Sequence, residues 1–289
     1  MSKHKKGKIE GTEDQIRIVA DLNTKCSGLF EELVTSIRKY TTAFVTLPDN
    51  PTESPKPCGT ATLVRINEGH YFLTASHVWG KLTKFKRIGI TLVPDINHCF
   101  EIPTKYLIAT GPRKPITRDE GPDIVLLKIP DAKLGEIKAR CSFYSLKPVV
   151  PKLALKTPCI EIGILLGAPG EAAKSTANSN LDVTIQGVNA DPAPKIFTKG
   201  PYDYLDSKEI AGNFGFPKSY RGFSGGGLWR LHVYYDPDTR ERKFRARLDG
   251  MAFHESSLKG GHRFIRCHGR RSIDAVKRMV LTKKTEQHD

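Results

Sequence analysis

The sequence lacks long apolar runs. No stretch of its 289 residues approaches the roughly 18 consecutive apolar residues that a membrane-spanning helix requires. The basic start of the chain, residues 1–15, is not followed by the apolar segment that a secretory signal contains. These two absences predict a protein without a membrane span that stays in the cytoplasm.

Cysteine is present but sparse and unpatterned. The chain has six cysteines, with no Cys-x-x-Cys pair and no zinc-ligand spacing. We therefore expect reduced and mostly buried thiols, no metal site, no cofactor, and no cysteine nucleophile. The cysteines are Cys26, Cys58, Cys99, Cys141, Cys159 and Cys267.

Acidic residues are scarce relative to basic ones. The chain has 31 Asp and Glu against 46 Lys and Arg, a formal net charge of +15. Such an excess favours an acidic protein partner or nucleic acid, although a solvated basic surface without a specific partner gives the same composition. No aromatic-interleaved RNA motif or zinc finger accompanies the charge. The basic runs occupy residues 3–8, 81–87, 240–247, 263–271 and 277–284.

A glycine-rich segment with one central serine, residues 221–229, stands out in the second half. Ser224 has Gly222 two positions before it and glycines directly after it. Glycine lets a chain turn tightly and leaves backbone N–H groups uncovered. A serine hydroxyl beside uncovered N–H groups has what acyl transfer needs, a nucleophile and an oxyanion site. A turn or linker is the alternative interpretation of such a segment.

Two upstream segments supply possible partners for this serine. Residues 71–78 are an apolar strand that leads into small residues and then His77, and residues 121–129 are a turn, Asp123 and an apolar strand. Asp123 follows His77 by 46 positions and Ser224 follows Asp123 by 101. The order His, Asp, Ser is one of the known arrangements of the Ser-His-Asp triad.

These three motifs together resemble those of trypsin-like (chymotrypsin-fold, PA clan) serine proteases of the bacterial type. Thr-Ala-Ser-His77 is similar to the family's Thr-Ala-Ala-His, and Asp123-Ile-Val-Leu-Leu to its Asp-Ile-Ala-Leu-Leu. Gly222-Phe-Ser224-Gly-Gly is similar to its Gly-Asp/Asn-Ser-Gly-Gly. The motifs occur in order and at family spacing over residues 41–270.

The resemblance implies a serine endopeptidase. Ser224 would be the nucleophile, His77 the general base, and Asp123 the group that orients the imidazole. The N–H groups of Gly222 and Ser224 would form the oxyanion hole. Phe223 replaces the aspartate with which digestive relatives capture a freed N-terminus, so activation by N-terminal cleavage is not expected, and the hole would form when substrate or a partner arrives.

The resemblance also implies positions for substrate binding. Phe253, His254 and Glu255 would flank the pocket for the side chain before the scissile bond (P1). Lys218, six residues before the serine, would line the floor of that pocket and favour an acidic P1 residue. A surface lysine is the alternative for Lys218.

The expected fold is all-β: two six-stranded antiparallel β-barrels with an added N-terminal helix and a C-terminal helix. Residues 1–40 form the helical extension, with a break at Ser27–Gly28, residues 41–140 the first barrel, and residues 141–289 the second barrel with a helix from Ser272. Residues 130–158 are expected as a linker. Expected strands cover residues 41–47, 59–64, 70–75, 88–93, 106–110, 124–129, 160–166, 181–188, 202–205, 227–233, 244–248, 251–253 and 262–267.

Two other functions remain compatible with the sequence. The first is a catalytically latent or inactive protease fold whose basic surface binds nucleic acid or an acidic protein. The second is an esterase of another fold, in which the catalytic histidine follows the serine. His254, His262 and His268 satisfy that order, whereas His77 does not.

Overall fold

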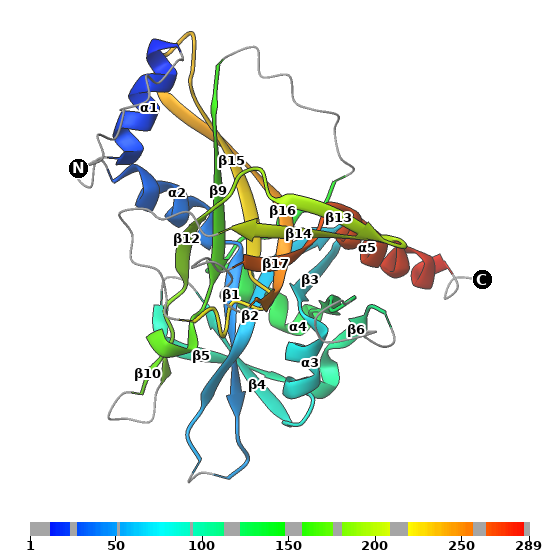
Figure 1. The fold of residues 1–289 in the computed structure, drawn as a ribbon. Helices are drawn as coiled ribbons and strands as arrows, with labels where there is room; N and C mark the ends of the chain where they lie inside the picture. The colour runs from blue at the N-terminus through cyan, green and yellow to red at the C-terminus, as the bar shows by residue number, and fades with distance from the viewer. Residues whose placement is uncertain are drawn as a thin grey trace.

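The computed structural model describes residues 12–23, 28–50, 53–92, 95–112, 122–147, 158–175, 181–208, 219–256 and 264–285. Over these ranges the chain forms two large, almost entirely antiparallel sheets with helices at their margins (Figure 1). The β-rich fold predicted from the sequence is confirmed. The two sheets have eight and seven strands, so they do not match the expected six-stranded barrels strand for strand.

The first sheet is built from the first half of the chain, in the order β5-β4-β1-β2-β3-β7-β6. A short strand, β8, adds to β2 in parallel. The strands are β1 Thr41–Leu47, β2 Lys56–Ile66, β3 Gly69–Thr74, β4 Arg87–Leu92, β5 Asp95–Pro103, β6 Ile108–Thr110, β7 Val125–Lys128 and β8 Tyr144–Ser145.

The second sheet is built from the second half, in the order β12-β9-β15-β16-β17-β14-β13. Its long central pair, β15 and β16, forms a hairpin that turns at Asp236. The strands are β9 Ile160–Gly167, β12 Gln186–Ala190, β13 Lys195–Lys199, β14 Tyr202–Lys208, β15 Gly227–Tyr235, β16 Arg242–Glu255 and β17 Phe264–Gly269. A separate two-stranded sheet pairs β10 Lys174–Ser175 with β11 Leu181–Asp182.

The two sheets share one apolar core. Phe44 and Phe72 of the first sheet and Tyr204 and Trp229 of the second are almost completely buried and belong to one cluster of touching side chains. Burial of apolar surface is the main favourable term in folding. The shared core therefore fixes the sheets relative to each other, and with them the loops at their ends.

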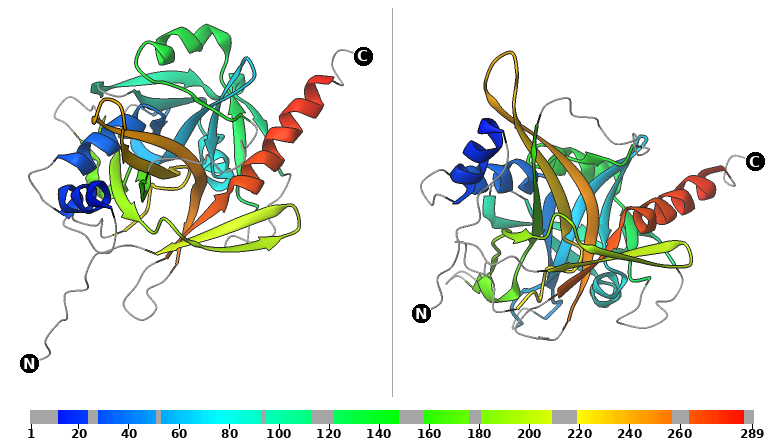
Figure 2. Two further views of the ribbon diagram at one scale, coloured as in Figure 1. Left: turned by 90° about the horizontal axis from the view of Figure 1, so that it is seen from above. Right: turned by 45° about the horizontal axis from the view of Figure 1, so that its top comes forward.

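The N-terminal extension is two helices, α1 Glu13–Asn23 and α2 Leu29–Arg38, which lie beside β9 and β15 (Figures 1 and 2). Gly28, with φ of +63°, stands at the start of α2, so the expected break is confirmed. The amide of Gln15 donates to the Thr12 hydroxyl and the amide of Thr12 donates to the Gln15 side chain, a reciprocal cap at the start of α1. The helices are part of the packed molecule.

The C-terminal helix α5, Arg270–Thr285, begins two residues before the expected start. Its first turns pack on β14 and β17, and its far end extends away from the sheets (Figures 1 and 2). Ser272, the expected start, lies inside the helix, and its hydroxyl donates to the carbonyl of Asp203. In the described ranges, no helix has both the length and the apolar composition needed to cross a membrane.

The segment expected as a linker, residues 130–158, is partly structured. It contains helix α4, Asp131–Lys138, and strand β8. Helix α4 was not predicted, because its segment is rich in charged residues and Ile137 is its one completely buried side chain. Strand 106–110 was also predicted too long, because residues 104–106 form a 3₁₀ turn, η1 Thr104–Tyr106.

Candidate active site

His77 and Asp123 are brought together by strand pairing. His77 is the second residue of helix α3, Ser76–Leu82, which follows β3. Asp123 lies just before β7. Because β3 and β7 are antiparallel neighbours, with Thr74 opposite Val125, the end of one strand meets the start of the other. Residues 46 positions apart therefore lie side by side, as the sequence predicted.

The carboxylate of Asp123 holds His77 at two points. One carboxylate oxygen accepts the backbone N–H of His77 at 2.9 Å, and the other lies 2.5 Å from the imidazole Nδ1. The Asp123 side chain is 3% exposed and that of His77 is 27% exposed. Because the carboxylate accepts, Nδ1 carries a hydrogen and donates it to Asp123. Nε2 is therefore the ring nitrogen that can accept a proton.

A second histidine, His268 on β17, supports Asp123 from behind. Its Nε2 accepts the backbone N–H of Asp123 at 2.9 Å. The ring is fully buried and stacks on Phe253, with centroids 4.3 Å apart. Burial disfavours the imidazolium and lowers the pKa of His268 to about 3. This histidine therefore stays neutral and can keep accepting the Asp123 amide.

The contact between His268 and Asp123 could not be inferred from the sequence. The sequence marked His268 only as one of the histidines that follow the serine. Its partner lies 145 positions away, and the contact depends on the pairing of β17 with β16 and on the packing of the second sheet against the first.

The serine loop turns as its glycines predict. Gly222 and Gly225 have φ of +100° and +95°, a region that favours glycine. The amide of Gly225 donates to the carbonyl of Ala252 at 2.7 Å, and the amide of Gly226 donates to that of Phe223 at 2.7 Å. Phe223 itself is 1% exposed. The loop is thus held by its own backbone hydrogen bonds and by the buried Phe223.

Two amides of this loop are left uncommitted. Within the described part of the chain, the N–H groups of Gly222 and Ser224 donate to no protein acceptor. These are the two amides that the sequence predicted for an oxyanion hole. An uncommitted pair of N–H groups next to a serine can bind a carbonyl oxygen on which negative charge develops.

A cavity of about 610 Å³ joins most of the predicted site residues. His77, Gly222 and Ser224 line it, together with Phe253, His254 and Glu255. The Ser224 hydroxyl donates to the carbonyl of Phe253 at 3.5 Å, a long contact that leaves it available. Lys218 lies outside the described residues, so its predicted place in the pocket floor stays a prediction.

Glu255 braces the wall of this cavity. Its Oε2 accepts the hydroxyl of Ser219 at 3.2 Å and the backbone N–H of Tyr220 at 3.1 Å. The carboxylate therefore ties the end of β16 to the start of the serine loop.

Among the described residues, no group of His, Cys, Asp and Glu is arranged to hold a metal ion.

Comparisons with known proteins add little to this geometry. No family model and no curated protein matches the chain. One solved structure, described as "Aromatic interactions drive the coupled folding and binding of the intrinsically disordered Sesbania mosaic virus VPg protein", matches with a TM-score of 0.39 and 11% identity. The match covers 78% of this chain and 85% of that one. At these values it establishes neither a common fold nor a common function.

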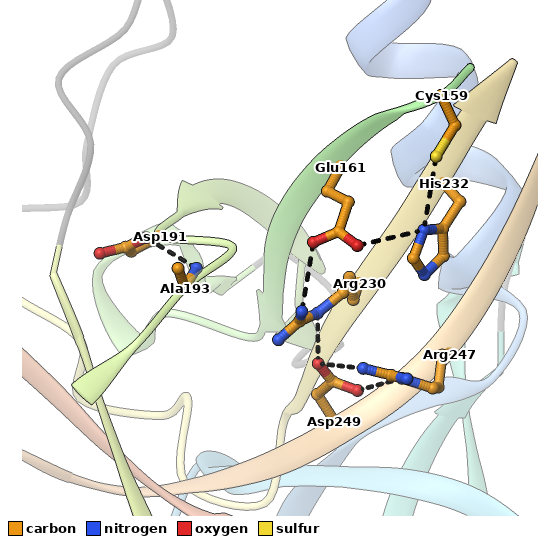
Figure 3. A network of polar contacts seen from close by, with 8 residues as sticks. All are labelled: Cys159, Glu161, Asp191, Ala193, Arg230, His232, Arg247 and Asp249. Carbon is orange, nitrogen blue, oxygen red and sulfur yellow. Dashed lines mark hydrogen bonds and ion pairs between the residues drawn. The ribbon is translucent and has the colours of Figure 1, made fainter. Parts of the chain in front are cut away.

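Several basic residues of the β15–β16 hairpin are paired with carboxylates of the protein. Figure 3 shows Arg230 between Glu161 and Asp249, with contacts of 3.2 and 2.6 Å, and Arg247 on the same Asp249 at 2.5 Å. The hydrogen bond that Arg247 donates to the Asp249 carboxylate raises the pKa of Arg247. Internal pairing reduces the positive charge that this part of the surface could offer to an acidic partner.

Proposed function

We propose that the protein is a serine endopeptidase that cleaves peptide bonds through a His77-Asp123-Ser224 triad and an acyl-enzyme intermediate. The observation that carries the proposal is that His77, held by Asp123 at 2.5 Å, lines the same cavity as Ser224 and Gly222, the residues with the two uncommitted amides. A histidine that only fills the core would not both hydrogen-bond a buried carboxylate through Nδ1 and line a cavity beside a serine. The combination is what a general base for a serine nucleophile requires.

In the proposed reaction, Nε2 of His77 takes the proton of the Ser224 hydroxyl as its oxygen attacks the substrate carbonyl. The amides of Gly222 and Ser224 stabilise the oxyanion, and Asp123 stabilises the imidazolium. His77 then gives its proton to the leaving amine, which leaves Ser224 acylated. A water molecule, deprotonated by His77, releases the acid and restores the serine.

The proposal includes the architecture of trypsin-like peptidases, one barrel for each sheet with additional strands. It is supported by the way in which the two sheets contribute different members of the proposed triad. His77 and Asp123 follow and precede strands of the first sheet, whereas Ser224 precedes β15 of the second. The cavity lies where the two contributions meet.

The substrate would be a protein or peptide whose P1 side chain enters along Phe253, His254 and Glu255, all of which line the cavity. Lys218 on the pocket floor, with a preference for an acidic P1 residue, remains part of the proposal. The geometry also favours His77 over His268, one of the later histidines that an esterase would use. His268 is buried and accepts the backbone amide of Asp123, and so it does not approach the Asp123 carboxylate as a base would.

The deciding experiment is labelling of the purified protein with a fluorophosphonate, a reagent that phosphonylates activated serines. We expect wild type to be labelled at Ser224, as located by peptide mass spectrometry. Ser224→Ala and His77→Ala should lose labelling by more than about 1,000-fold, because the triad members act as a unit. Ser36→Ala on α2 and His232→Ala on β15 are matched controls that should label like wild type.

Labelled His77→Ala protein would contradict the proposed base and favour the esterase alternative. An unlabelled wild type would contradict the proposed activity, and the basic surface would then be tested as a binding surface.

A further inference from the structure

We propose that Thr60, on β2, is a positioning residue whose hydroxyl holds the proposed oxyanion hole in its working geometry. The inference rests on the proposed function and assigns a role to a residue outside the triad. Thr60 belongs to the first sheet, whereas the amides it would position belong to a loop of the second. The residue is fully buried and lies 162 positions before Gly222.

Thr60 makes three hydrogen bonds in this region, two through its hydroxyl and one through its backbone N–H. Its oxygen accepts the backbone N–H of Ala168 at 3.0 Å, and its proton is donated to the carbonyl of Gly222 at 2.6 Å. The backbone N–H of Thr60 also donates to the carbonyl of Ser224 at 2.8 Å. One residue thus contacts the carbonyl of each hole residue, Gly222 and Ser224.

The peptide between Gly222 and Phe223 is locked at both of its polar groups. Its carbonyl accepts the Thr60 hydroxyl, and its N–H donates to the carbonyl of Tyr220 at 3.0 Å. A peptide group is planar, so fixing both groups fixes the plane. This plane lies between the two hole amides, and its orientation sets the direction in which each of them points.

The amide of Gly222 is aimed through its own peptide plane. The carbonyl of Arg221 accepts the N–H of Gly170 at 2.9 Å. In a trans peptide the C=O and N–H point in opposite directions, so the Gly222 N–H points away from Gly170. Gly170 is two residues beyond Ala168, with Pro169 between them at φ of −62°. By holding the Ala168 amide, Thr60 also steadies the segment that holds Arg221.

Few other side chains could take this place. A hydroxyl can accept one hydrogen bond and donate another at the same point. Valine has the same branched shape as threonine without either capacity, so it would leave a buried amide and a buried carbonyl unpaired. Serine keeps both capacities and loses only a methyl group.

The test compares Thr60→Val and Thr60→Ser with wild type in fluorophosphonate labelling, in which the rate at saturation is separated from the half-saturating concentration. Removing one oxyanion-hole donor costs about 100- to 1,000-fold in rate. For Thr60→Val, which misaligns the donors without removing them, we expect a loss of roughly 10- to 100-fold at saturation. The half-saturating concentration should stay unchanged, and Thr60→Ser should restore the rate.

Thr42→Val is the matched control. Thr42 is equally buried on β1, and its hydroxyl donates to the carbonyl of Thr91 at 2.6 Å, the same length as the Thr60 bond to Gly222. The Thr42→Val variant should melt at a lower temperature than wild type, as Thr60→Val should, but it should be labelled at the wild-type rate. Thr60→Ala repeats the comparison without a new methyl group, in case the valine variant does not fold.

Three results would overturn the proposed role while leaving the protease proposal intact. They are labelling of Thr60→Val and Thr60→Ala at the wild-type rate, a loss of rate in Thr42→Val equal to that in Thr60→Val, and failure of Thr60→Ser to restore the rate. Failure of wild type to be labelled would instead overturn the proposed function itself, together with this inference.

Discussion

His268 is a fully buried histidine that uses one ring nitrogen to accept a hydrogen bond from a main-chain amide. Protonation would turn that acceptor into a second donor facing the N–H of Asp123. In the folded protein, burial lowers the pKa of His268 to about 3 from an ordinary value of 6.5. The consequence is a dependence of stability on pH.

Between pH 6.5 and about 3 the unfolded chain binds a proton at His268 that the folded chain refuses. The free energy of unfolding should therefore fall as the pH is lowered through this window, by up to about 1.4 kcal/mol per pH unit from this residue. His268→Gln keeps an acceptor and removes the titration, so its stability should vary less with pH. Urea unfolding of both proteins at several pH values from 4 to 7 measures the difference.

His70 and His232 also have pKa values lowered by burial, so part of the acid dependence should persist in His268→Gln. Equal slopes in the variant and the wild type would show that His268 does not carry the titration assigned to it.

At the scale of elements, α1 and α2 are attached to the body in different ways. Helix α2 buries an apolar face that includes Leu33 and Ile37. The two helices also share one ionic link. Arg242 on β16 contacts Asp21 of α1 and Glu32 of α2, each at 2.9 Å.

Replacing Arg242 by glutamine should loosen α1 and leave α2 in place. Partly exposed ion pairs contribute about 1 kcal/mol or less, which is enough to change local opening of α1, whose completely buried apolar side chain is Ile18, more than that of α2, which buries five. We expect faster hydrogen exchange in α1 and unchanged exchange in α2. Arg245→Gln is the control, since Arg245 lies on the same strand and stacks over Tyr234. A uniform change across both helices would contradict this division.

Much of the element pattern was predictable, for physical reasons that differ along the chain. Apolar strands such as β3 and β9 and the break before α2 follow from local sequence. The meeting of His77 and Asp123 follows from antiparallel neighbours. Helix α3 was missed because it has only seven residues and starts inside the histidine motif.

Tertiary contacts set the limit of prediction for the site. Threonine is a common strand residue, so Thr60 carries no local signal that its hydroxyl reaches Gly222. From Phe223 we expected an oxyanion hole that forms when substrate or a partner arrives. In the structure Phe223 is buried and packs against Tyr220, with ring centroids 5.0 Å apart. A side chain that breaks a family motif can thus be accommodated by its neighbours.

For the whole molecule, the shared core predicts where the chain can be shortened. Deleting residues 1–27 removes α1 and with it one completely buried core side chain, Ile18, while the α2 side chains of the core stay in the protein, so it should fold with a smaller loss of stability than the longer truncation. Deleting residues 1–38 also removes Leu29, Phe30 and Leu33 from the core, at about 2–5 kcal/mol for each large side chain lost. Thermal unfolding of the two truncations checks this difference. A stable protein lacking residues 1–38 would contradict the role of α2 in the core.

The link between β17 and Asp123 also bears on when the chain could act during its own synthesis. A ribosome delivers His77 and Asp123 early, yet the imidazole that supports Asp123 arrives 145 residues after it. The loop carrying Ser224 likewise reaches Thr60 only after the 162 residues from Thr60 to Gly222 have emerged. A nascent chain therefore holds its proposed nucleophile and base apart until the second sheet has been made, and the order of the strands itself would delay the proposed cleavage.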